Sequence, residues 1–441
     1  MSFGKYKYML LKKNYYKSFL RKLASLRLAI GLLFFIGILI SIGTIIEQDQ
    51  TITFYQDNYP DTNPLFGFFT WRYIIYLGLD HLYSASWFLS ILTLFALSLL
   101  ACTFTTQLPA LKKFRLWQFL DRFNKLKRLS SFKELKRKNS NIAAYRLYNE
   151  NYHLFRQGRK NYSYSGLLGR VGPIIVHFSI MVLIIGTSWG ALSGYNIQEI
   201  IPRGEIVHLQ NLVKRGPSSY LSNNTVLRIN DFWITYTSES KINQFYSDIS
   251  LLNKFGSEII RKTIFVNEPL QFKGLTIYQT DWDLLGLKFS LNESKDIQIP
   301  LKKITKSGRK FWLGSIKIDK LSNQQFTILC NDLNGDLYLY DQQGVLLKKL
   351  SIGDNVTIIP SNNLKFKNFI TSTGLQIKED PGLITVYLAF LFLMLSIYIS
   401  FFSYSQIWGI EQKQFFIIGG KSNRAVLAFQ ETFKKSVRLL K

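Results

Sequence analysis

The sequence predicts a multi-pass α-helical membrane protein in which four transmembrane helices carry one large β-rich domain between helices three and four. Three observations predict this fold class. Four long apolar runs contain no Asp, Glu, Lys or Arg, basic charge is concentrated in alternate segments between these runs, and the longest segment consists of short β-type stretches separated by turn residues. A chain of 441 residues has room for more than one folded unit, because single cores rarely exceed about 250–300 residues.

Each apolar run approaches the ~20 residues that a helix needs to cross about 30 Å of hydrocarbon. The four predicted spans are residues 28–46, 86–104, 171–191 and 383–404. The first span follows a basic segment, as a signal peptide would. It is too long for a signal-peptide core, however, and it lacks an Ala-x-Ala-like cleavage site. We therefore predict that it stays in the membrane as an uncleaved helix.

The charge of the connecting segments predicts the orientation of the chain. Residues 1–27 carry a net charge of +8, residues 105–170 carry +13, and residues 405–441 carry +5. Residues 47–85, in contrast, carry −4. Because basic segments stay on the cytoplasm-like side of a membrane, both termini and the middle basic loop face that side. The 47–85 loop and residues 192–382 face the opposite compartment.

This topology also accounts for the basic composition. The chain has Lys+Arg 55 against Asp+Glu 28, a formal net charge of +27. Most of this charge fixes orientation or contacts anionic membrane lipid, so we predict no nucleic-acid partner. Two interpretations are open for residues 112–138: a basic amphipathic helix on the membrane surface, with Trp117, Phe119 and Phe123 as apolar anchors, or a solvated basic loop.

Residues 192–382 form the predicted β-rich domain. They are nearly balanced in charge, with 23 basic and 18 acidic residues. Short stretches rich in β-branched and aromatic residues, such as 226–236 and 326–330, alternate with turn signals such as Gln343-Gly344. We predict a sandwich or an open barrel that is held to the membrane at both ends.

His177 is the one ionisable residue inside the predicted spans, about 9 Å from the basic-side edge of the third. Ionisable groups in lipid usually face a partner or a functional cavity, and a neutral imidazole is a common axial ligand of haem iron. The alternative is a neutral structural histidine that is hydrogen-bonded to a neighbouring helix, with Ser179 or Tyr398 as its partner. His153 and His208 lie outside the spans without companions, and we interpret both as structural.

His81 lies just before the second span, at the opposite face of the membrane. It follows Asp80, and Tyr83 and Trp87 are near it in the sequence. The group could form an interfacial contact with haem or with a partner protein. An ordinary belt of interfacial aromatic residues explains Tyr83 and Trp87 equally well.

The sequence lacks the motifs of several classes of enzyme. The only cysteines are Cys102 and Cys330, which form no CxxC pair, so a thiol–disulfide reductase is not supported. Neither a zinc-type HExxH nor a phosphate-binding GxxxxGK[ST] or GxGxxG segment is present. Four spans without an inverted repeat also argue against a small-solute transporter. No catalytic residue is predicted.

Short motifs spread over nearly the whole chain point to one family. They include Gly169-Arg-Val-Gly-Pro-Ile-Ile-Val-His177, Tyr278-Gln-Thr-Asp-Trp282 and Gly419-Gly-Lys-Ser-Asn-Arg-Ala425. Others lie at residues 25–31, 43–48, 63–72, 78–81, 99–109, 189–194, 373–378 and 380–382. In this order, and on a frame of four spans, they resemble the plastid-type CcsB/ResB family of cytochrome c biogenesis proteins, which belongs to system II.

The resemblance implies a role at the haem-attachment step of c-type cytochrome biogenesis. Acting with a CcsA-type partner, the chain would deliver reduced haem to apocytochromes, which are cytochrome f and a soluble lumenal cytochrome. It would be a non-catalytic subunit of a cytochrome c haem-attachment (synthetase) complex that binds haem transiently. The alternative is a structural scaffold for the CcsA-type protein that binds no haem itself.

The resemblance also bears on the two histidines. His177 matches the family's histidine in this span, which makes it the first candidate ligand of haem iron. His81 matches the family's Leu-Asp-His pattern and is the second candidate. Some family members carry a further histidine before the second span, where this chain has Tyr83-Ser-Ala-Ser-Trp87. Ligand assignments from those members do not transfer to this region.

The residue bias towards Lys, Asn, Ile, Phe and Tyr suggests an AT-rich genome, and no transit peptide is evident. Together with the resemblance, this predicts a plastid-encoded protein of the chloroplast thylakoid membrane. A cyanobacterial thylakoid or plasma membrane is the alternative. In the plastid, the 105–170 loop and the 405–441 tail would be stromal, whereas the 47–85 loop and the 192–382 domain would be lumenal.

Overall fold

The chain divides into two compact units, and each is described here by itself. The first comprises Met1–Trp189 and Gly382–Lys441, and the second comprises Gly190–Pro381. The computed structural model describes residues 15, 17–120, 122–136, 140–220, 226–238, 241–292, 295–306, 309–317, 325–331, 336–359, 362–412 and 414–438. Residues 1–14, the first half of the predicted basic N-terminal segment, lie outside the described residues.

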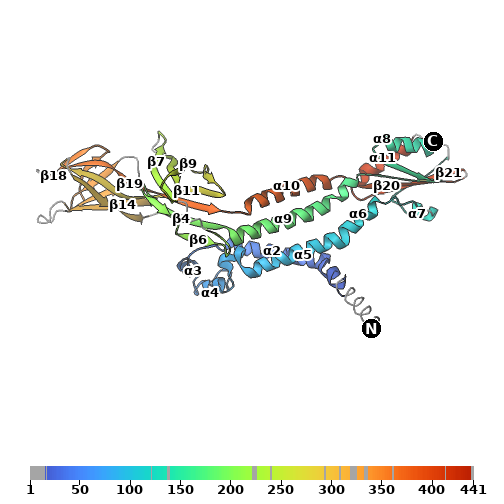
Figure 1. The fold of residues 1–441 in the computed structure, drawn as a ribbon, viewed down its shortest axis with the longest axis horizontal. Coiled ribbons are helices and arrows are strands. Elements are labelled where there is room, and N and C mark those ends of the chain that lie inside the picture. The colour runs from blue at the N-terminus through green and yellow to red at the C-terminus, as the bar shows by residue number, and fades with distance from the viewer. Residues whose placement is uncertain are drawn as a thin grey trace. The chain divides into compact units, whose positions relative to one another are not determined.

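Four helices of the described chain are long and apolar enough to cross a membrane (Figure 1). They are α2 (Leu26–Ile45), the continuous helix Ser86–Arg115 that begins with α5 (Ser86–Cys102), α9 (Gly172–Ser193) and α10 (Leu383–Ser400). Only 11% of the apolar window of α9 is fully buried within the chain, and most of its residues are partly exposed. These helices and the β-rich insertion after α9 confirm the predicted fold class.

The second membrane helix extends beyond its predicted end at residue 104. It continues through a π-helical segment, η2 (Thr103–Gln107), into α6 (Leu108–Arg115). The sequence criterion ended the span where polar residues begin. The last turn of α6 nevertheless contains the basic residues Lys112, Lys113 and Arg115. Their positive charges stabilise the helix, because its C-terminal end carries a negative partial charge.

The 47–85 loop folds onto the ends of α2 and α5. It contains α3 (Ile52–Asn58), α4 (Trp71–Tyr76) and the 3₁₀ helix η1 (Leu79–Ser84). Gln48 fastens this segment, because its amide nitrogen donates to the carbonyl groups of Ile46 (2.9 Å) and Leu79 (2.8 Å). Its amide oxygen accepts the N–H of Leu82 at 2.9 Å. The loop is therefore a fixed cap on these helices.

At the other end of the same helices, two segments that we predicted as a basic loop and a tail fold into one antiparallel sheet. Its strand order is β1-β21-β20-β3-β2. The strands are β1 (Ser131–Lys136), β2 (His153–Gln157), β3 (Lys160–Ser165), β20 (Ser405–Glu411) and β21 (Phe415–Ser422). Neither interpretation of residues 112–138 was correct, because this stretch contains the end of α6, the short helix α7 (Phe123–Lys127) and β1.

The basic-side sheet is covered on both faces. Trp408 and Ile417 pack with Leu126 of α7 on one face. On the other face, Ile407 and Ile418 pack against α8 (Ser140–Asn149) and α11 (Val426–Arg438). Neighbouring residues in a strand thus point to opposite faces, as the pleat requires. Residues 137–139, between β1 and α8, lie outside the described residues.

The described residues of the second unit form three antiparallel sheets. A seven-stranded sheet is formed by β4 (Tyr195–Pro202), β6 (Leu212–Arg215), β10 (Leu270–Phe272), β11 (Leu275–Leu291), β12 (Lys295–Pro300), β18 (Asn355–Ile359) and β19 (Asn362–Glu379). A four-stranded sheet is formed by β5 (Ile206–His208), β7 (Val226–Tyr236), β8 (Ile242–Leu252) and β9 (Glu258–Phe265). The third is formed by β13 (Lys302–Lys306), β14 (Arg309–Lys317), β15 (Gln325–Cys330), β16 (Leu337–Tyr340) and β17 (Leu346–Leu350).

Two long strands organise this unit into two sandwiches. β11 and β19 pair along their lengths, from Leu275 opposite Glu379 to Leu291 opposite Leu364. The first half of β11 and the second half of β19 form one core with the four-stranded sheet, centred on residues such as Ile277. The second half of β11 and the first half of β19 form another core with the β13–β17 sheet. The predicted sandwich is therefore present twice, on a shared pair of strands.

Candidate functional site

His177 lies in the second turn of α9, and both of its ring nitrogens contact the π-helical segment η2. Its Nδ1 lies 3.1 Å from Oγ1 of Thr103, and its Nε2 lies 3.1 Å from Nε2 of Gln107. The partners that we considered from the sequence are wrong. The Ser179 hydroxyl donates instead to the carbonyl of Ile175 (2.7 Å), and the Tyr398 ring packs on Phe402.

The π-helical turn that carries Thr103 and Gln107 has a local cause. Pro109 has no N–H group and cannot bond to the carbonyl four residues before it, as a regular helix requires. The chain widens just before this proline, and the N–H of Leu108 bonds to the carbonyl of Thr103, five residues back. Such single wide turns occur frequently at functional sites. Here the turn aims two polar side chains at one imidazole ring.

The hydrogen bonds define the tautomer of His177. The Thr103 hydroxyl donates its single proton to the carbonyl of Leu99 at 2.8 Å. It must therefore accept the proton of His177 Nδ1–H. Nε2 then carries the lone pair, which accepts an N–H of the Gln107 amide. The arrangement is that of many metal-binding histidines, in which one nitrogen is anchored and the other is a Lewis base.

The Gln107 amide is only partly satisfied. Its Oε1 is buried and has no hydrogen-bond partner among the residues that the structure describes. Thr103, in contrast, is buried and uses its hydroxyl both as donor and as acceptor. Moving Gln107 away from the imidazole would break one hydrogen bond of an amide that is already partly unsatisfied. Moving Thr103 away would break two hydrogen bonds of a buried hydroxyl, so its free-energy cost would be higher. The residues present fit a site in which an incoming metal centre replaces Gln107 at Nε2.

His81 lies in η1, and its half-exposed ring is next to Asp80. Nδ1 lies 2.9 Å from Oδ1 of Asp80, but this oxygen is not aligned as a hydrogen-bond acceptor. The main chain on both sides of His81 is held by Gln48, through Leu79 and Leu82. The pairing of Asp80 with His81 that the sequence suggested is thus present as a close contact between the two side chains on a fixed turn.

The two candidate histidines belong to separate sites. His81 precedes the first residue of α5, whereas His177 contacts residues that follow its last residue. The 17 residues of α5 span about 25 Å at 1.5 Å per residue. One haem cannot be ligated by both side chains in this arrangement.

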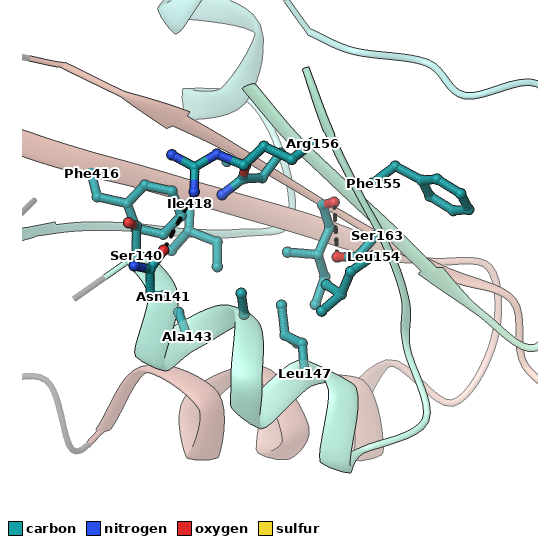
Figure 2. A pocket seen from close by; sticks show the side chains of 14 residues that line it. Ser140, Asn141, Ala143, Leu147, Leu154, Phe155, Arg156, Ser163, Phe416 and Ile418 are labelled. Carbon is teal, nitrogen blue, oxygen red and sulfur yellow. Dashed lines mark hydrogen bonds between the residues drawn. The ribbon is translucent and has the colours of Figure 1, made fainter. Parts of the chain in front are cut away.

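The other two histidines are not among the hydrogen-bond partners of His177. The His153 ring packs on Tyr164, and His208 lies in β5. Figure 2 shows a cavity of about 110 Å³ between α8 and the basic-side sheet, with Arg156 at its edge. Arg156 bonds to Glu411 (3.0 Å) and Asn141 (3.4 Å), and neither candidate histidine lines this cavity.

Metal-ligating side chains do not cluster elsewhere in the described ranges. No group of three or more His, Cys, Asp or Glu there could hold an ion, and neither Cys102 nor Cys330 forms a disulfide. The sequence analysis identified His177 but missed Thr103 and Gln107. The signal that could have found them is Pro109, which marks a break in the helix register next to two polar residues.

Four helices long and apolar enough to cross a membrane and a large β-rich insertion after the third define a polytopic membrane protein, with the His177 imidazole held between two of these helices. Residues 26–312 match the model of the ResB-like family. The chain belongs to this family, and the resemblance inferred from its motifs is confirmed.

Individual relatives are similar over nearly their full length. The chain is 58% identical over 426 residues to "Cytochrome c biogenesis protein Ccs1" of Emiliania huxleyi, covering 97% of each chain. It is 43% identical over 417 residues to the protein of the same name from Pyropia yezoensis, covering 94% of each. It is also 41% identical over 433 residues to "Cytochrome c biogenesis protein CcsB" of the cyanobacterium Microcystis aeruginosa, covering 96% of each.

Proposed function

We propose that this chain is a membrane subunit of the machinery that matures c-type cytochromes, and that it delivers haem for attachment. The observation that carries the proposal is the His177 imidazole, which is anchored at Nδ1 by Thr103 and presents its Nε2 lone pair between lipid-exposed helices. The names of the relatives support a role in cytochrome c biogenesis. Their algal and cyanobacterial sources support a thylakoid membrane location.

Haem is the cargo in this proposal. Its apolar ring suits the lipid-exposed surface of α9, and its iron requires axial ligands. His177 supplies one ligand, and a CcsA-type partner supplies the second, since no other metal-ligating side chain contacts this imidazole in the described chain. The two β-sandwiches offer a rigid surface on which the apocytochrome is received.

A second function, a scaffold for the CcsA-type protein that binds no haem, is favoured by one observation. Both ring nitrogens of His177 already have hydrogen-bond partners, as expected for a purely structural histidine. The two functions make opposite predictions for the haem content of a His177 variant.

The test is to purify the full-length chain with its CcsA-type partner and to record the haem absorption spectrum of wild type and of His177→Ala. We expect His177→Ala to lose most of its haem, because iron loses an axial ligand. His153→Ala is the matched control, since His153 packs on Tyr164 outside the membrane helices and should keep the wild-type content. A normal haem spectrum for His177→Ala would refute ligation and favour the scaffold.

Thr103 and Gln107 should have different effects on haem binding. Thr103→Val removes the acceptor that fixes the Nδ1–H tautomer, and we expect haem affinity to fall about 10- to 100-fold, as for other groups that orient metal ligands. Gln107→Leu removes the group that competes for Nε2, so affinity should be unchanged or higher. Both are measured by titrating the purified protein with haem. An equal loss in the two variants would contradict the assignment of Nε2 as the ligand atom.

A further inference from the structure

Two of the motifs in the sequence meet at one place in the structure, although about 250 residues separate them. Arg170 of the Gly169–His177 motif lies in η4 (Leu167–Arg170), just before α9. Arg424 of the Gly419–Ala425 motif donates from Nη1 to the carbonyl of Ser400, the last residue of α10, at 2.8 Å. Both guanidinium groups therefore lie at the basic-side ends of membrane helices.

Arg170 is held by aromatic rings and not by an anion. Its Cζ lies 4.2 Å from the ring centroid of Phe114 and 5.0 Å from that of Tyr404. Its guanidinium makes no hydrogen bond or ion pair with any residue in the described part of the chain, and its Nε is buried without a partner. An arginine has five N–H donors and cannot be deprotonated in proteins, so a half-buried arginine without an anion is unusual.

Arg424 adds a second positive charge beside the first. Burial and, to a smaller extent, the charge of Arg424 lower the pKa of Arg170. No acidic side chain of the described residues pairs with either arginine, whereas Arg156 in the same unit is neutralised by Glu411. Two like charges that are held together in this way favour the binding of an anion with more than one negative charge.

This arginine pair lies on the same helix seam as His177. Arg170 precedes His177 by seven residues, and Phe114 follows Gln107 by seven residues. The contact of Arg170 with Phe114 therefore repeats the contact of His177 with Gln107 two turns nearer the end of the helices. Seven residues of helix correspond to about 10 Å. A ligand could extend along the seam from the imidazole to the two guanidinium groups.

We propose that Arg170 and Arg424 bind the two propionate carboxylates of a haem whose iron is ligated by His177. The inference rests on the proposed function and adds a recognition site to it. Haem carries both carboxylates on one edge of an apolar ring, so its iron can lie among the helices while its charged edge stays at the polar boundary. Arginine suits this role because its planar fork matches the geometry of a carboxylate.

The test compares haem with haem dimethyl ester, in which the propionates carry no charge. Both are titrated into the detergent-purified full-length chain, as wild type, Arg170→Gln and Arg424→Gln. We expect wild type to bind haem at least about tenfold more tightly than the ester, a ratio typical of charge-assisted hydrogen bonds. Each variant should lose this preference for haem, while the spectrum of the bound form keeps its histidine-ligated signature.

Lys421→Gln is the matched control. Lys421 belongs to the same motif, also lies over an aromatic ring (Nζ 5.5 Å from the Trp408 centroid) and carries the same charge. It should retain the wild-type preference for haem. If Arg170→Gln and Arg424→Gln also retain it, or lose affinity for haem and ester equally, the proposal is overturned. Loss of co-purified anionic lipid without a change in the haem-to-ester ratio would also overturn it and would assign the arginines to a lipid headgroup.

The failure of this inference can be told apart from failure of the proposed function. If His177→Ala weakens the binding of both haem and ester while the arginine variants bind as wild type, only the propionate site is wrong. If His177→Ala weakens neither, the ligand assignment itself is wrong.

Discussion

Gly169→Ala should prevent the tight packing of the start of α9 on the end of α10 and lower the yield of folded protein from membranes. A Cβ atom at residue 169 would overlap the backbone carbonyl oxygen of Phe402. A backbone carbonyl cannot rotate away as a side chain can, so the loss of folding free energy should lie at the upper end of about 1–3 kcal/mol. The measurement is the amount of monodisperse protein after detergent extraction, together with its thermal unfolding temperature.

Alanine substitutions at the neighbouring glycines should destabilise the protein to different extents. Gly166 has φ +73° and faces the carbonyl of Ser403, so alanine there adds backbone strain to a similar clash. Gly172 meets mainly the hydroxyl of Ser400, which can change rotamer, so Gly172→Ala should cost less. Gly37→Ala in α2 is the control, because a Cβ there has no atom within 4 Å. Wild-type yield and stability for Gly169→Ala would show that the junction is looser than described.

Trp312→Ala is expected to unfold the second β-sandwich while the first stays intact. The Trp312 side chain is 2% exposed, packs on Trp282 with ring centroids 5.2 Å apart, and donates from Nε1 to Oδ1 of Asp283 at 2.7 Å. Truncating a buried tryptophan costs about 3–5 kcal/mol, and the carboxylate of Asp283 would lose a donor as well. Hydrogen exchange on the full chain should show lost protection in β13–β17 and unchanged protection in β7–β9.

The control for this experiment is Trp233→Ala. Trp233 is 39% exposed and stacks on Tyr246 at the surface of the first sandwich, so its loss should cost less than about 1 kcal/mol. Equal loss of protection in both sandwiches of Trp312→Ala would mean that β11 and β19 couple them into one cooperative unit.

The membrane helices could be predicted because their signal is local. A run without charged residues identifies a span whatever surrounds it, and the charge of each connecting segment is read from the sequence directly. The β-rich nature of residues 192–382 was predictable for the same reason. That β11 and β19 continue through both sandwiches was not, because bulges, for example between Gln279 and Asp281, interrupt the alternation from which strand length is read.

The basic-side sheet escaped prediction because its signal is not local. β3 pairs with β20, which places Tyr162 opposite Trp408, about 250 residues later in the chain. Each strand is short, and its flanking lysines and arginines resemble those of a solvated loop. For the candidate site, the ligand-type residue His177 was recognisable as an ionisable group in lipid. Thr103, Gln107 and Arg170 were not, because their roles depend on which helices are neighbours.

His81 stays a prediction. The structure places it at the end of α5 opposite His177, on a turn fastened by Gln48. A function there would concern the compartment opposite to the basic side, and it would be independent of the His177 site.

The pairing of β20 with β3 and of β21 with β1 also determines when this sheet can form during synthesis. β20 and β21 are made only after α10. The β2–β3 hairpin can pair at once, but β1 and the free edge of β3 lack their neighbours while some 240 residues are made. A chain that stops early exposes unpaired strand edges, which are prone to aggregation. The sheet that joins the second, third and fourth membrane helices can therefore close only after β20 and β21 have been translated.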